Sequence, residues 1–76
     1  MTKHQITTNT RKHHISTVWV EALGCYETMV FKYKGKAKID WSGESTERTE
    51  DREQAINHHI SAIIMVMEWE SHAKNA

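Results

Sequence analysis

The most regular pattern of apolar positions lies in the C-terminal third of the chain. Four large apolar residues recur there at intervals of four, three and four, the spacing of one stripe along an α-helix: Ile56, Ile60, Ile63 and Met67. Thr49 is a suitable N-cap, and Glu50 and Asp51 place negative charge at the positive end of the helix dipole. The pattern predicts one long helix from Thr49 to about His72.

Upstream, apolar and polar residues alternate with the period of a β-strand. We expect strands at 16–22 and 26–33, joined by a two-residue turn at Leu23-Gly24, and a third strand at 37–41. This register gathers the large apolar side chains on one face, where we expect the helix to lie: Val18, Val20, Met29, Phe31, Ile39 and Trp41. The predicted fold is α+β, a three-stranded antiparallel meander (β-β-β-α) packed on one long C-terminal helix.

The two segments outside this pattern are polar. Residues 1–15 are rich in threonine and lack a period, so we expect a mobile N-terminal arm, with a short edge strand near Ile6 as the alternative. Residues 16–76 then form the single domain. Residues 42–49 read as an acidic connector between the third strand and the helix.

The predicted helix has more apolar surface than such a sheet can cover. Its apolar positions span roughly 220° of the circumference, about twice an ordinary core-facing stripe. A second copy of the chain is the simplest cover, and the expected homodimer interface consists of Ala55, His59, Ala62, Met65, Val66 and Trp69. The alternative is that the N-terminal arm folds over this side.

Composition describes one small domain of 76 residues with a single cysteine, Cys25, which excludes an internal disulfide. The net charge is zero but uneven: residues 1–38 carry seven Lys/Arg against two Glu (+5), and residues 39–76 carry three against eight Asp/Glu (−5). No signal peptide and no apolar run near ~18 residues occur, so we expect a cytoplasmic protein without a membrane segment.

The six histidines do not form a recognisable metal motif. Four residues after His58 and His59 stand Ala62 and Ile63, which cannot ligate. Glu68 and His72 form one i, i+4 pair, which could hold a metal or form a hydrogen bond, but zinc needs three or four ligands. No catalytic triad motif and no glycine-rich phosphate loop occur. The sequence predicts no metal, no cofactor and no catalysis.

Two surfaces are candidates for binding a partner. On the face of the sheet opposite the expected helix, Trp19 lies among Lys32, Lys36 and Lys38, as on platforms that stack single-stranded nucleic acid. A solvated sheet face is the plain alternative. The connector and helix start present carboxylates where a nucleic-acid-binding partner would expect phosphates: Glu44, Glu47, Glu50 and Asp51.

The runs YETMVF (26–31), IDWSGES (39–45) and ERTEDREQAINHH (47–59) resemble a pattern of small phage and prophage accessory proteins of unassigned role. Many such proteins act by stoichiometric binding, anti-CRISPR proteins among them. The resemblance implies a non-catalytic, phage-encoded inhibitor or modulator of a host protein or defence nuclease complex that acts by steric occlusion. Single-stranded nucleic-acid binding and a structural role in an oligomeric assembly are the alternatives.

Overall fold

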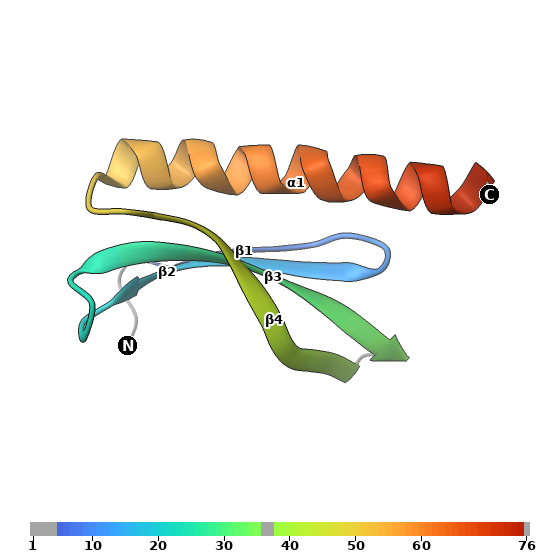
Figure 1. The fold of residues 1–76 in the computed structure, drawn as a ribbon, viewed down its shortest axis with the longest axis horizontal. Helices are drawn as coiled ribbons and strands as arrows, with labels where there is room; N and C mark the ends of the chain where they lie inside the picture. Colours follow the sequence, from blue (N-terminus) through green and yellow to red (C-terminus); the bar gives the residue numbers. More distant parts are fainter. Residues whose placement is uncertain (1–4, 36–37, 76) are drawn as a thin grey trace.

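A computed structural model describes residues 5–35 and 38–75, which form four strands and one helix. The strands form one antiparallel sheet in the order β1-β2-β3-β4, and the helix α1 lies across one face of it (Figure 1). The α+β class is confirmed, with one strand more than predicted. The elements are β1 (Gln5–Asn9), β2 (His13–Val20), β3 (Cys25–Gly35), β4 (Lys38–Thr49) and α1 (Arg52–Asn75).

The additional strand comes from the N-terminal segment. Residues 5–15 were expected to be a mobile arm; instead they form β1 and the start of β2, as in the alternative that placed an edge strand near Ile6. Ile6 pairs with Thr17 and Thr8 with Ile15. The residues of β1 include the β-branched Ile6, Thr7 and Thr8, which favour a pleated strand once a neighbour supplies hydrogen bonds.

The turn between β2 and β3 is longer than predicted. It spans Glu21–Gly24, with Val20 paired to Cys25 in place of Ala22, and Gly24 adopts a left-handed φ of 65°. A register change of two residues leaves every side chain on its original face. The expected connector at 42–49 is also part of the sheet, because β4 continues to Thr49 through irregularities in its pairing with β3.

The helix begins later than predicted, with Asp51 as its N-cap. The Glu53 N–H donates to Asp51 Oδ1 (3.2 Å), and the Ala55 N–H donates to the Asp51 carbonyl (2.9 Å). The predicted cap, Thr49, lies two residues before Asp51: its hydroxyl accepts the Asp51 N–H (3.1 Å) and so shapes the turn into the helix.

The helix packs on the face opposite to the predicted one. Its buried residues are Ala55, His59, Ala62 and Val66, and they meet Ile15, Thr17, Thr28 and Val30 of β2 and β3. The prediction chose the face with the larger apolar side chains. The structure instead pairs small alanines with threonines, which lets helix and sheet approach closely and lets hydroxyl groups reach the helix.

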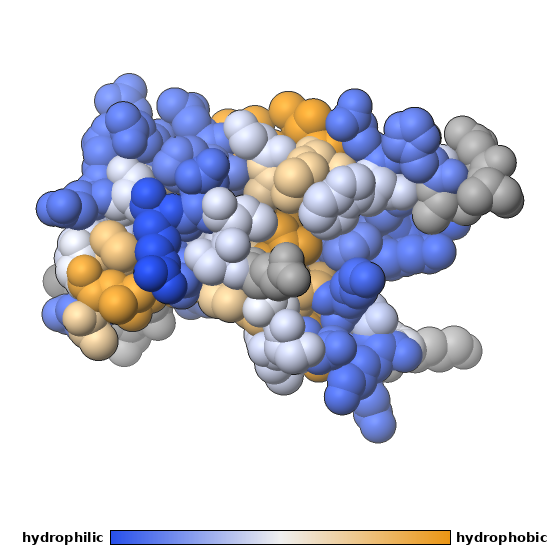
Figure 2. Space-filling model, viewed as in Figure 1, coloured by the Kyte–Doolittle hydropathy of each residue, from blue (hydrophilic) through white to orange (hydrophobic). Residues whose placement is uncertain are grey.

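This arrangement leaves two apolar surfaces uncovered in the described part of the chain. One is the outer face of the sheet, which carries the residues once expected under the helix: Val18, Val20, Met29, Phe31, Ile39 and Trp41. The other is the side of α1 that faces away from the sheet, where apolar side chains gather at the middle of its upper edge (Figure 2). No helix in the described residues has the length and hydropathy to span a bilayer.

Gly43 in β4 is a position where the sheet tolerates no side chain. A Cβ there would overlap the carbonyl oxygen of Val30 and the ring of Phe31. We expect Gly43→Ala to lower the free energy of unfolding by about 1–3 kcal/mol, because a backbone carbonyl in a strand cannot move aside without loss of pairing. Urea denaturation measures this change. Gly35→Ala is the control, since a methyl group at that position would have no neighbour within 4 Å, and an equal loss in both variants would contradict the account.

Candidate functional site

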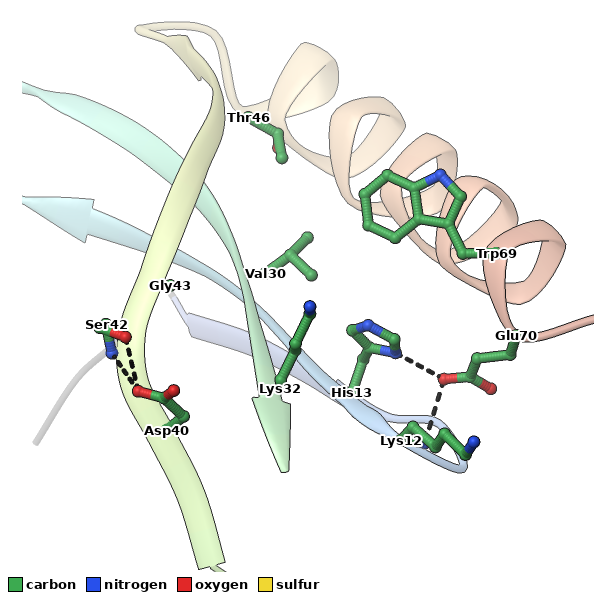
Figure 3. A pocket seen from close by; sticks show the side chains of 10 residues that line it. All are labelled: Lys12, His13, Val30, Lys32, Asp40, Ser42, Gly43, Thr46, Trp69 and Glu70. Atoms are coloured by element: carbon green, nitrogen blue, oxygen red, sulfur yellow. Dashed lines mark hydrogen bonds and ion pairs between the residues drawn. The ribbon is translucent and has the colours of Figure 1, made fainter. Parts of the chain in front are cut away.

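A groove of about 620 Å³ opens between the C-terminal half of α1 and the sheet (Figure 3). Trp69 forms one wall from the helix, Val30 lies at the sheet, and Lys32 extends its amine into the groove. The lining residues are Lys12, His13, Val30, Lys32, Asp40, Ser42, Gly43, Thr46, Trp69 and Glu70. They come from β2, β3, β4, α1 and the β1–β2 turn, so only the tertiary structure assembles them.

Glu70 joins the helix to the β1–β2 turn at one end of this groove. Its Oε2 accepts hydrogen bonds from the Thr10 hydroxyl (2.5 Å), the Lys12 N–H (3.0 Å) and Nδ1 of the buried His13 (2.7 Å). Burial raises the pKa of Glu70, but these hydrogen bonds outweigh burial and lower the pKa to about 2. The carboxylate therefore stays charged and acts as a tie between two distant segments.

His59 is the centre of a second polar network, inside the core. Its Nε2 lies 2.9 Å from the Thr8 hydroxyl and its Nδ1 lies 2.8 Å from the Thr17 hydroxyl, which in turn lies 2.8 Å from the Thr28 hydroxyl. His59, Thr17 and Thr28 are almost fully buried. Burial lowers the pKa of His59, so a neutral ring donates through one nitrogen and accepts through the other.

The groove is also lined by Asp40 and Ser42, which are hydrogen-bonded to each other. The Ser42 hydroxyl (2.6 Å) and N–H (3.1 Å) both donate to Asp40 Oδ1 and lower the pKa of Asp40. Among the described residues, no three His, Cys, Asp or Glu side chains come together as metal ligands. Glu68 and His72, the pair suggested by spacing, are both exposed, and Cys25 is a half-buried free thiol. The groove offers the indole of Trp69, the amine of Lys32 and two hydrogen-bonded carboxylates, a set suited to binding.

Trp19 and Lys32 were predicted on the face of the sheet opposite the helix, but both lie on the helix side. Trp19 packs edge-on against Tyr26, with ring centroids 5.0 Å apart, on the helix side of the sheet. Lys32 lines the groove, Lys38 is exposed at the start of β4, and Lys36 lies outside the described residues. The acidic set follows the end of β4 and the helix start: Glu47, Glu50 and Asp51 are exposed, and the side chain of Glu44 lies outside the described part.

The residues of the expected dimer interface do not lie together on one exposed surface. Ala55, His59, Ala62 and Val66 face the chain's own sheet and are buried, so they offer nothing to a second copy. Met65 is half-buried, and Trp69 lies at the groove. The prediction was wrong for the buried four because it assigned the wrong side of the helix to the sheet.

Sequence reasoning missed an aromatic cluster on the outer face of the sheet. The Phe31 ring lies 5.0 Å from Trp41 and 6.0 Å from His14, and the Trp41 and His14 rings lie 5.9 Å apart. Phe31 is buried beneath its neighbours, whereas Trp41 is 66% exposed. The alternation of the strands placed Phe31 and Trp41 on one face, but that face was predicted to be the core.

No family model, curated protein or solved structure matches this chain. The geometry of the molecule is therefore the basis for assigning a function.

Thr17 connects His59 to Thr28, so the hydroxyl is the part of this side chain that matters. We expect Thr17→Val, which nearly preserves the shape, to lower the free energy of unfolding by about 1–3 kcal/mol because it leaves a buried imidazole nitrogen unpaired. Thermal denaturation of the variant beside Thr7→Val, an exposed threonine of β1, measures the effect. Equal stabilities of the two variants would contradict the network's role.

The Glu70 tie predicts a specific pH dependence. A pKa of about 2 in the fold, against an ordinary 4.5, means that its stabilisation is complete above pH 4.5 and is lost as the pH falls toward 2. We expect Glu70→Gln to be less stable than the native chain at pH 7, with the difference shrinking below pH 4.5. Urea denaturation across this range tests it.

His59 affects stability over a different pH range, and it does so equally in the native chain and in Glu70→Gln. Its lowered pKa favours the neutral ring in the fold, so stability falls as the pH drops below 6.5, where the unfolded chain binds a proton first. The comparison of native and Glu70→Gln chains cancels this contribution. A stability difference independent of pH from 7 to 2 would refute the assignment to Glu70.

Proposed function

We propose that the chain is a small non-catalytic binding protein that docks onto another protein through the outer face of its sheet. The observation that carries this proposal is the direction of the sheet's apolar side chains. The helix covers the threonine-rich face, and the face with Val18, Met29 and Trp41 has no second layer in the described residues (Figure 1). A face of this kind on a small domain is typical of an interaction site.

The outer face has the composition of a protein interface. Trp41 stands out from it above the buried ring of Phe31, and Tyr33 is held in place because its hydroxyl donates to Asn9 Oδ1 (2.7 Å). Aromatic side chains fixed in this way are frequent centres of binding energy. At the other end of the face, the exposed Arg48 pairs with Glu27 (2.8 Å) and contributes a polar rim.

The mechanism that suits such a surface is steric occlusion. A protein that covers a partner's surface with a rigid sheet blocks it without chemistry, in keeping with the resemblance to phage accessory proteins. We therefore propose a host protein or a defence nuclease complex as the partner. The alternative of a single-stranded nucleic-acid platform loses its support, because Trp19 packs against Tyr26 on the helix side of the sheet.

Affinity capture from a host lysate, followed by mass spectrometry, tests the proposal when it is done with matched variants. Trp41→Ser removes the exposed centre of the face, and Leu23→Ser removes an exposed apolar side chain in the β2–β3 turn. We expect the native chain and Leu23→Ser to retain the same protein, and Trp41→Ser to retain roughly tenfold less or none. Circular dichroism confirms that both variants fold. Capture unaffected by Trp41→Ser, or no specific protein retained, would refute the proposal.

A further inference from the structure

We infer that the outer side of α1 binds a second copy of this chain, with the two helices antiparallel and crossed. The surface is a ridge of residues at intervals of four along the helix, which we call the helix ridge: Arg52, Ile56, Ile60, Ile64 and Glu68. It is distinct from the interface expected from the sequence. The helix that carries it covers one face of the sheet, and the outer sheet face is the other (Figure 1).

The apolar part of the helix ridge is exposed over three successive turns. Ile60 is 50% exposed, Ile64 is 58% exposed, and Met67 beside them is 58% exposed. Ile63, half-buried against the core, lies between the ridge and the sheet. Ile63 and Met67 form the neighbouring row at the same interval of four, and the space between two such rows is where the matching ridge of another helix packs.

The spacing of the helix ridge sets the crossing angle. Ridges formed by every fourth residue are inclined to the helix axis, and two such ridges pack side by side when the helices cross at about −50°. In that geometry the two ridges run alongside each other through the contact, and the long side chains at their ends extend toward the partner's ridge. Charges at those ends therefore meet the ends of the partner's ridge.

The charges at the two ends of the helix ridge decide whether the two helices pack antiparallel or parallel. The helix ridge begins with a cation, Arg52, and ends with an anion, Glu68, and both side chains are exposed. In an antiparallel pair centred on Ile60, Arg52 of each copy lies opposite Glu68 of the other, twice by symmetry. A parallel pair would place like charges together. Within the described residues, the side chains of Arg52 and Glu68 have no hydrogen bond or ion pair in their own chain.

This self-complementarity identifies the occupant as a second copy. A two-fold axis brings one patch against itself, so the patch must carry both halves of every pair, as the helix ridge does. The consequence for function rests on the proposed docking face, which this dimer leaves free on each copy. The dimer would present two such faces and bind a repeated or two-fold partner with increased avidity.

Sedimentation equilibrium over micromolar concentrations, with charge-reversal variants, tests the arrangement. We expect the native chain to be a dimer and Ile60→Glu, which changes an exposed residue, to be a folded monomer. Arg52→Glu and Glu68→Arg should each raise the dimer dissociation constant about tenfold or more, because each creates two like-charge contacts. The double variant R52E/E68R should return the constant to within about threefold of the native value.

The outcomes separate this inference from the proposed docking face. Trp41→Ser lies outside the helix ridge and should remain dimeric whether or not it captures a partner. A native chain that is monomeric at hundreds of micromolar, or that forms higher oligomers, would overturn the inference. The inference would also be overturned if Ile60→Glu disrupts the dimer but the two single charge reversals leave it unchanged. That result would require a different relative direction of the two helices.

Discussion

The contact between His59 and the threonines of the sheet is the interaction on which this fold depends. One neutral imidazole uses both nitrogens, toward Thr8 on β1 and toward Thr17 on β2, and Thr17 extends the chain to Thr28 on β3. A buried polar group must find its partners or lose stability, so this network admits only one face of the sheet beneath the helix. The alanines on either side of it in the helix sequence, Ala55 and Ala62, keep the helix close enough for the bonds to form.

Glu70 provides the second attachment, three turns farther along the same side of α1. It accepts hydrogen bonds from Thr10, Lys12 and His13 at the β1–β2 turn. The helix is therefore attached to the N-terminal hairpin at two points, His59 and Glu70. Between these points the apolar core is small, consisting of Ile15, Val30, Ala62 and Val66 with Ile63 beside them. A chain of 76 residues has little surface to bury, and here polar ties hold the layers while large apolar side chains remain outside.

That division gives the molecule two opposite apolar surfaces with different characters. The helix ridge is aliphatic and ends in opposite charges, which suits a copy of itself. The outer sheet face is aromatic with a polar rim, which suits a different protein. Because the sheet and helix separate them, occupation of one leaves the other open. A dimeric protein with two docking faces would block its partner by coverage alone, and the groove at Trp69 would remain accessible beside the helix.

The sequence by itself determined the helix, three of the four strands and the excess of apolar surface. The spacing of Ile56, Ile60 and Met67 specifies a helix, and alternation specifies strands, because these periods are properties of the local backbone. Alternation places side chains on two faces of the sheet but does not say which face the helix covers. That choice was decided by the fit of His59 and two alanines of the helix to the threonines of the sheet. The tie at Glu70 joins residues nearly sixty positions apart, and β1 becomes a strand only beside β2. Such contacts depend on distance in space, which a one-dimensional pattern does not contain.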